Sequence, residues 1–284
     1  MANHHLSHPL NAPGPLYVDT TCIDCGTCFH LGPELFHEEG EASIVEAQPQ
    51  SLAQWGQAKA AILSCPTNSI GVKSPPAEFR QAQENLPQLI DDNIYYCGYT
   101  ARSSFGASSY LIRRPEGNIL VDCPKFHPHL VKKLEELGGV AWIFLTHRDD
   151  VADHSQYAQH FKASRIIHKL EVSADTSACE MILEGEGDWE LNNESKVIFT
   201  PGHTRGHLCL LYKNKFLFSG DHLFYSQDED KVYASQNVSW YSWEIQEQSI
   251  KKLMQYKFDW LMPGHGGWIH KDHESILQDL KKMS

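Results

Sequence analysis

Five clusters of histidine and aspartate, each directly after a hydrophobic run typical of a strand, constrain the fold of this chain most strongly. The clearest is the turn at residues 200–207, which presents His203 and is followed by a second strand that ends before Asp221. Two types of metal ligand at neighbouring strand ends indicate a metal centre on the edge of a sheet. The other three clusters are Asp122, the run at residues 147–154 and His265.

A cluster of cysteines marks a second, smaller unit. Cys22, Cys25 and Cys28 share one short loop, and Cys65 follows downstream, directly before a proline. Two consecutive C-x-x-C steps let three thiolates surround one inorganic cluster, while the distant cysteine supplies the fourth ligand. Structural zinc can use the same four thiolates, and reactive thiols without a metal are a third reading. The tandem spacing favours a [4Fe–4S] cluster, because zinc sites more often pair two separated C-x-x-C knuckles.

Composition and charge exclude several classes of partner. The charged residues sum to 24 − 36 = −12, and no basic stretch is present that would suit nucleic acid or an anionic membrane. No apolar run reaches the ~20 residues of a transmembrane helix, and the first 15 residues lack the apolar core of a secretory signal. We therefore expect a cytoplasmic protein that binds neither nucleic acid nor membrane.

The pattern along the chain predicts two domains and two irregular segments. Residues 1–15 read as a disordered lead-in, and residues 16–73 alternate short strands with a helix that begins after Ser51. Residues 74–92 are rich in proline, glutamine and aspartate, a composition typical of a linker. Residues 93–284 mix strands and helices and carry all five histidine and aspartate clusters.

Both domains resemble known families. Residues 16–73 are similar to single-cluster bacterial-type ferredoxins, which implies electron transfer through a [4Fe–4S] cluster held by the four cysteines. Residues 94–284 resemble the metallo-β-lactamase superfamily, because residues 200–207 match its third-ligand motif, Asp221 its bridging aspartate and residues 263–265 its last histidine. The fold class implied is α+β: a small ferredoxin-like domain followed by an αββα sandwich with one or two metals at the strand ends.

The main motif of that family departs from its usual form, T-H-x-H-x-D-H. Anchoring on the strand end keeps His147 as the first ligand and puts Asp149 in place of the second histidine. The pair Asp153 and His154 fits the end of the motif only if two residues are inserted, and we prefer this gapped alignment because the pair leads into a helix. The resemblance then implies one metal held by His147, Asp149 and His203, a second held by Asp153, His154 and His265, and Asp221 between them.

Residues close to these ligands receive supporting roles. The resemblance places Asp122 behind the ligands, where such a carboxylate orients them. His207, His222 and His168 are expected near the site in structural or supporting roles. Asp221 and Asp149 are the residues expected to take part in catalysis.

The carboxylate at Asp149 makes the ligand set harder, which favours iron over zinc and leaves manganese open. Some members of the superfamily, the flavodiiron proteins, carry a related H-x-E-x-D pattern and bind two irons. We therefore expect a di-iron oxidoreductase that receives electrons from the [4Fe–4S] cluster. One alternative is a zinc hydrolase similar to glyoxalase II, acting on thioesters or lactones, and another is a non-catalytic redox sensor. Expected partners are a small-molecule substrate, an external electron donor and, in a homo-oligomer, further copies of the chain.

Overall fold

A computed structural model describes residues 2–283 and divides them into two compact units. The first unit contains the described residues up to Arg113 together with Pro124–Gly138. The second contains Arg114–Cys123 and the described residues from Gly139 onward. The cysteine cluster therefore lies in the first unit, and all five histidine and aspartate clusters lie in the second.

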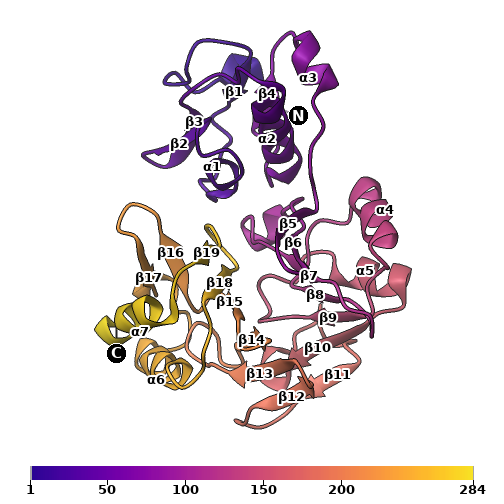
Figure 1. The fold of residues 1–284 in the computed structure, drawn as a ribbon, viewed down its shortest axis with the longest axis vertical. Helices are drawn as coiled ribbons and strands as arrows, with labels where there is room; N and C mark the ends of the chain where they lie inside the picture. Colours follow the sequence, from indigo (N-terminus) through magenta and orange to yellow (C-terminus); the bar gives the residue numbers. More distant parts are fainter. Residues whose placement is uncertain (1, 284) are drawn as a thin grey trace. The chain divides into compact units, whose positions relative to one another are not determined.

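The first unit combines short strands with four α-helices among its described residues (Figure 1). Its elements are η1 His4–Leu6, β1 Leu16–Val18, α1 Thr27–Leu31, β2 Phe36–Glu39, β3 Ala42–Val45, α2 Leu52–Ser64, β4 Ile70–Val72, α3 Ala77–Gln81, β5 Gln88–Asp91, β6 Ile94–Tyr96, η2 Arg102–Ser104, β7 Tyr110–Ile112 and α4 Pro128–Glu136.

Local sequence accounts for the elements around the cysteines. The hydroxyl of Ser51 accepts a hydrogen bond from the Gln54 N–H (3.2 Å) and caps α2, as predicted. The helix ends at Ser64, because Pro66 disfavours a helical conformation in the residue before it. Strands β1 and β4 pair antiparallel, with Leu16 opposite Val72, and thereby bring Cys22 and Cys65 to the same end of the unit.

The N-terminal residues that the structure describes, expected as a disordered lead-in, contain η1 and bond to strands of the same unit. The side chain of Asn11 accepts hydrogen bonds from the Val18 and Val45 N–H groups (3.2 and 2.9 Å). The Ala12 N–H donates to the Val45 carbonyl (2.7 Å). These bonds to backbone groups of β1 and β3 hold the segment, although it has little apolar surface to bury. The expected linker at residues 74–92 likewise contains α3 and β5, and β5 pairs with β6.

The second unit contains most of the strands. Its elements are β8 Ile119–Val121, β9 Trp142–Phe144, α5 His154–Phe161, β10 Ser164–His168, η3 Lys169–Glu171, β11 Met181–Leu183, β12 Trp189–Asn192, β13 Ser195–Phe199, β14 Leu208–Tyr212, β15 Phe216–Gly220, β16 Phe224–Ser226, β17 Lys231–Tyr233, η4 Gln236–Val238, α6 Trp243–Leu253, β18 Trp260–Pro263, β19 Ile269–His270 and α7 His273–Lys282.

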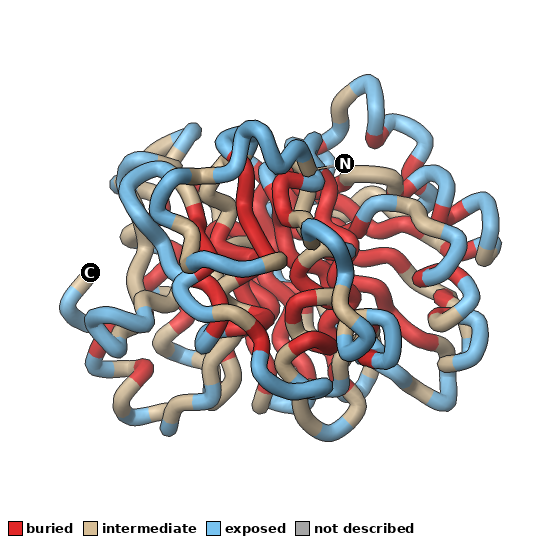
Figure 2. Tube along the Cα trace, turned by 90° about the horizontal axis from the view of Figure 1, so that it is seen from above, coloured by how far each residue is buried: buried red, intermediate tan, exposed pale blue. Residues whose placement is uncertain are grey.

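Ten of these strands form two layers of sheet, and β16 and β17 pair separately as a hairpin. Strands β8, β9, β10 and β11 pair in parallel in the order β11-β10-β9-β8. The other sheet has the order β12-β13-β14-β15-β18-β19, and β15 and β18 run parallel within it. Figure 2 shows the buried residues as runs through the interior, with exposed segments around them. The mixed sandwich with two sheets confirms the predicted fold class.

One face of the six-stranded sheet is covered by helices α6 and α7 (Figure 1). Their side chains Ile250, Leu253, Ile276 and Leu280 pack with Ile198 and other strand residues in one buried core. Both helices are amphipathic, with polar residues on their outer faces, as burial against a sheet requires. No helix among residues 2–283 is long and apolar enough to cross a membrane.

Candidate metal centres

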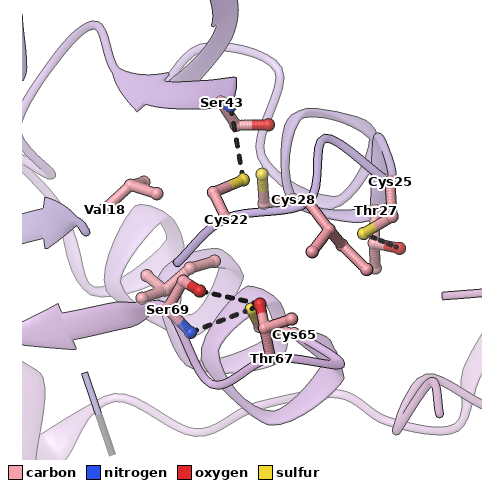
Figure 3. A pocket seen from close by; sticks show the side chains of 11 residues that line it. Val18, Cys22, Cys25, Thr27, Cys28, Ser43, Cys65, Thr67 and Ser69 are labelled. Atoms are coloured by element: carbon pink, nitrogen blue, oxygen red, sulfur yellow. Dashed lines mark hydrogen bonds between the residues drawn. The ribbon is translucent and has the colours of Figure 1, made fainter. Parts of the chain in front are cut away.

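The four clustered cysteines line one pocket in the first unit, together with Val18, Thr27 and Ser43. Figure 3 shows Cys22 and Cys28 next to each other, and Cys65 beside Thr67 and Ser69. Cys22, Cys25 and Cys28 come from the loop before α1 and from α1 itself, whereas Cys65 is the C-cap of α2. The structure therefore brings together the four thiols that the sequence predicted as cluster ligands.

Backbone amides already point at two of these sulfur atoms. The Asp24 and Ser43 N–H groups donate to Cys22 Sγ (3.4 Å each), and the Ser69 N–H donates to Cys65 Sγ (3.2 Å). Such bonds suit sulfur that carries negative charge, as in a ligand to iron. Four convergent thiols with amide donors fit a [4Fe–4S] cluster.

In the second unit, the predicted polar clusters follow the C-terminal ends of strands. Asp122 follows β8, residues 146–150 follow β9, residues 200–207 follow β13, Asp221 follows β15, and His265 follows β18. Neighbouring strand ends lie along one edge of each sheet, so side chains that are far apart in sequence meet there.

One group of side chains consists of His147, Asp149 and His203, whose ligand atoms lie within 4.8 Å of one another. The Nε2 atoms of His147 and His203 are each 3.9 Å from Asp149 Oδ2. The two rings stand nearly perpendicular, with centroids 4.8 Å apart. Both histidines are buried, whereas the Asp149 side chain is 49% exposed and forms the open side of the group.

A second group contains Asp150, His265 and Asp221. His265 Nε2 lies 3.9 Å from Asp150 Oδ1 and 3.5 Å from Asp221 Oδ2. Asp221 Oδ2 also lies 4.0 Å from His147 Nε2 and 3.8 Å from His203 Nε2, so Asp221 stands between the two groups. Only glycine fits at position 264, because a Cβ there would lie 2.5 Å from Asp221 Oδ1 and 3.0 Å from Asp150 Oδ2.

Hydrogen bonds indicate which ring nitrogen carries the proton in His147 and in His203. When Asp122 is ionised, Thr146 donates its hydroxyl proton to that carboxylate (2.9 Å), and His147 then donates from Nδ1 to the Thr146 oxygen (2.9 Å). His203 Nδ1 donates to the Val238 carbonyl (2.5 Å). Both Nε2 atoms therefore present a lone pair to the site, and neither has a hydrogen-bond partner among residues 2–283. This is the arrangement that metal-binding histidines require.

The charges of the site also fit a cation. Burial lowers the pKa of His147 to about 3, so its imidazole is neutral near pH 7. Burial raises the pKa of Asp150 well above its ordinary value, and the neighbouring Asp221, Asp122 and Asp149 raise it further. Burial alone would also raise the pKa of Asp221, but the imidazoles around it lower that pKa. Buried carboxylates crowded in this way are stabilised by positive charge at the centre.

Two predicted ligands lie elsewhere. Asp153 is the N-cap of α5, and His154 is the first residue of that helix. The His154 side chain contacts Ser155 (3.4 Å). Burial lowers the pKa of His154, and the positive charge of Arg165 lowers it further. Among the described residues, neither Asp153 nor His154 belongs to a group of ligand atoms that all lie within 4.8 Å of one another, so the gapped alignment stays a prediction. Asp150, which the alignment passed over, takes the place beside His265.

The residues predicted to support the site differ in what they contact. Asp122 accepts hydrogen bonds from the Thr146 N–H (2.9 Å) and hydroxyl and acts on His147 through that threonine. The His207 ring lies 5.2 Å from that of His147 and 5.5 Å from that of His222. Burial lowers the pKa of both His207 and His222. His168 bonds to the Gly185 carbonyl (2.9 Å), outside both groups.

One buried carboxylate joins two of the ligand-bearing loops, and sequence reasoning missed it. Glu171 Oε2 accepts from the Arg148 N–H and Nε (3.1 and 2.9 Å), and its Oε1 accepts from the Gly206 N–H (2.6 Å). Arg148 lies between His147 and Asp149, while Gly206 belongs to the turn that presents His203. The only sequence signal was the arginine inserted between two ligands, which requires a partner.

Comparison with known proteins matches each part of the chain to a family. Residues 18–72 match the family model of the 4Fe-4S single cluster domain of Ferredoxin I, and residues 91–282 match that of the Metallo-beta-lactamase superfamily. A metallo-beta-lactamase from Pontibacter korlensis is similar at 19% identity and a TM-score of 0.53, over 69% of this chain and 97% of that one.

Two further solved structures share the fold. VMB-1 is 16% identical with a TM-score of 0.52, over 69% of this chain and 93% of its own. The BLEG-1 B3 metallo-beta-lactamase is 19% identical with a TM-score of 0.51, over 62% and 93%. At these identities the likeness concerns the fold alone, but the superfamily model spans more than half of the 284 residues. The chain belongs to the metallo-beta-lactamase superfamily and carries a single-cluster 4Fe-4S ferredoxin domain ahead of it.

Proposed function

We propose that this protein is an oxidoreductase that holds two metal ions, preferably iron, among its histidines and aspartates and receives electrons from a [4Fe–4S] cluster bound by its four clustered cysteines. The observation that supports this most directly is the number of carboxylates. Asp149, Asp150 and Asp221 converge with three histidines. Oxygen donors in this proportion favour iron or manganese over zinc.

Each side chain has a distinct role in this proposal. His147, Asp149 and His203 would hold one metal, Asp150 and His265 would hold the other, and Asp221, which lies between the two groups, would be available to both. When bound, such a pair of metals supplies redox chemistry on a small-molecule substrate. Asp149 is half exposed, so it is the ligand that a substrate meets first and that can exchange a proton with solvent. The buried Asp221 keeps the two halves of the site together.

The cysteine domain supplies the reductant in this scheme. A [4Fe–4S] cluster transfers one electron at a time, and an external donor restores it after each transfer. Because cluster and metal centre belong to one chain, the donor is present at a high effective concentration. A hydrolytic zinc site has no need of such a donor, so zinc hydrolysis of a thioester or lactone is the alternative that the experiment must exclude.

The experiment is anaerobic purification with metal analysis and EPR. We expect about six irons per chain in the wild type, four in the cluster and two in the histidine and aspartate site. In His147→Ala the non-cluster iron should fall while the cluster signal stays. The matched control is His160→Ala, which removes an exposed histidine of α5 and should leave the metal content unchanged.

Two results would contradict the proposal. Four irons together with one or two zincs, and turnover of a thioester panel regardless of the cluster's oxidation state, would identify a zinc hydrolase. Four irons alone, with no other metal in the wild type or after reconstitution, would indicate that the second site is a remnant and the protein a sensor.

A further inference from the structure

A chain of three hydroxyl groups links a buried carboxylate to one of the cluster's cysteines. Asp19 is 2% exposed and accepts a hydrogen bond from the Thr21 hydroxyl (2.5 Å). The Thr21 hydroxyl contacts that of Ser69 (2.7 Å), and Ser69 contacts that of Thr67 (2.7 Å). The Thr67 hydroxyl lies 3.6 Å from Cys65 Sγ. Figure 3 shows Ser69, Thr67 and Cys65, the end of the chain next to the cluster pocket.

The chain has four contacts but only three hydroxyl protons, so the direction of each bond can be derived. A carboxylate only accepts, and Thr21 therefore gives its one proton to Asp19. Ser69 must then donate to Thr21, and Thr67 must donate to Ser69. A cysteine sulfur bound to iron has no proton of its own. The contact between Thr67 and Cys65 is consequently left without a hydrogen.

The ionised state of Asp19 is supported by its other partners. Its Oδ2 accepts from the Asn3 N–H (2.7 Å) and its Oδ1 from the Thr21 N–H (2.9 Å). Burial alone would raise the pKa of Asp19, but the hydrogen bonds from Thr21 and Asn3, together with the nearby Ser69 hydroxyl, lower it below its ordinary value. The carboxylate therefore holds the chain in one direction, away from the cluster.

We propose that Asp19 orients the hydroxyls of Thr21, Ser69 and Thr67 away from Cys65 and thereby holds the reduction potential of the [4Fe–4S] cluster low. Hydrogen bonds to the sulfur ligands of a cluster stabilise its more negative, reduced state and raise its potential. Cys65 receives such a bond from the Ser69 N–H but is denied a second one from Thr67. A lower potential makes the cluster a stronger reductant. This inference rests on the proposed function, because it requires that the [4Fe–4S] cluster is bound.

The test breaks the chain at two different points. Thr21→Val removes the link to Asp19 but keeps the carboxylate and nearly the same shape, so Ser69 can donate to Thr67 and Thr67 to Cys65. Ser69→Ala removes the middle hydroxyl and keeps the Ser69 backbone bond to Cys65. In both variants Thr67 is free to donate to the sulfur. We expect both to shift the midpoint potential to less negative values and to lower the Fe–S(Cys) stretching frequency in resonance Raman spectra.

Thr67→Val distinguishes this orientation from a general effect of losing a hydroxyl. Because Thr67 does not donate to Cys65 in the wild type, Thr67→Val alone should leave the potential unchanged. Combined with Thr21→Val, it should cancel the positive shift. Thr20→Val, the same change at the exposed neighbouring threonine, is the control and should leave the potential at the wild-type value.

The outcomes separate this inference from the proposed function. The potential is measured by an anaerobic redox titration followed by EPR on the full chain, so no substrate is needed. A normal cluster whose potential is unchanged in both Thr21→Val and Ser69→Ala would overturn the inference alone. A negative shift in Thr67→Val would do the same, because it would mean that Thr67 already donates to Cys65. A wild-type chain that binds no cluster would overturn the proposed function and this inference with it.

Discussion

At the scale of single residues, Asp150 is the side chain for which structure and sequence motif differ most. Its carboxylate is buried 3.9 Å from His265 Nε2, whereas Asp153 occupies the N-cap position of α5 without a side-chain capping bond. We expect Asp150→Asn to lose one of the two non-cluster metals, because an amide neither carries the charge nor binds metal as strongly as a carboxylate. Metal analysis of the purified variant measures this loss directly.

Asp153→Asn is the matched comparison, because it makes the same chemical change three residues away. It should retain both non-cluster metals. If Asp153→Asn loses a metal and Asp150→Asn does not, the gapped alignment is right and the arrangement of the site described above is wrong.

Glu171 should matter for stability as well as for the position of the ligands. In the wild type, three N–H groups donate to the fully buried Glu171 carboxylate. Glu171→Gln replaces one of its oxygens with an amide nitrogen, which cannot accept these bonds. Hydrogen bonds to charged groups contribute more than neutral ones, so we expect a loss of about 2 kcal/mol in the free energy of unfolding. Urea denaturation measures it, with Glu184→Gln, in an exposed ion pair with Lys169, as the control that should change by less than about 1 kcal/mol. Equal losses in the two variants would count against a special role for Glu171.

The sequence predicted five of the six side chains that converge at this site, and the sixth, Asp150, was missed for a physical reason. His147, Asp149, His203, Asp221 and His265 follow strands, and a strand end fixes where its next residue lies. The run at residues 149–154 leaves the strand and enters a helix, so each side chain direction depends on where the turn stops. That stop is set by tertiary packing, which a motif does not encode.

At the scale of secondary-structure elements, an ion pair joins β10 to the start of β11. The Arg165 guanidinium donates to Glu180 (2.7 Å), and this bond lowers the pKa of Glu180 from 4.5 to about 2 despite opposing burial. A carboxyl whose pKa is lower in the folded state than in the unfolded state stabilises the fold at pH values above its unfolded-state pKa. This stability is lost as the pH falls to the folded-state pKa. We expect the stability difference between wild type and Glu180→Gln to be constant above about pH 5 and to vanish between pH 4.5 and 2.

Denaturation curves across that range test the expectation, and Glu190→Gln supplies the comparison. Glu190 pairs with Lys196 at an exposed site, where solvent screens the interaction. A stability difference for Glu180→Gln that persists at pH 2 would show that lost packing, rather than the charge, accounts for it.

Elements were predicted well where a local signal marks them. Ser51 predicted the start of α2, and hydrophobic runs predicted the strands β9, β13, β14 and β18. The hairpin of β16 and β17 and the strand β5 lack such runs, because only one residue of β16, one of β17 and none of β5 is buried. They form through pairing with a neighbouring strand, and this information is not local.

At the scale of the whole molecule, the two centres draw their ligands from different units. The four cysteines belong to the first unit, and the histidines and aspartates belong to the second. We therefore expect Cys25→Ala to abolish the cluster signal in EPR and to retain the two non-cluster metals. Cys97→Ala, which removes a buried cysteine outside the cluster pocket, should retain both centres. Loss of all metal in Cys25→Ala would mean that the second site cannot form without the cluster.

The measurement that tests the central claim most directly is Mössbauer spectroscopy of the wild-type chain produced with ⁵⁷Fe. It separates iron bound by sulfur from iron bound by nitrogen and oxygen in one sample. We predict that about one third of the iron, two of six atoms, shows the parameters of a nitrogen- and oxygen-ligated centre, and that this fraction disappears in His147→Ala. A spectrum in which all iron belongs to the [4Fe–4S] cluster, in a protein that also contains zinc, would contradict the account.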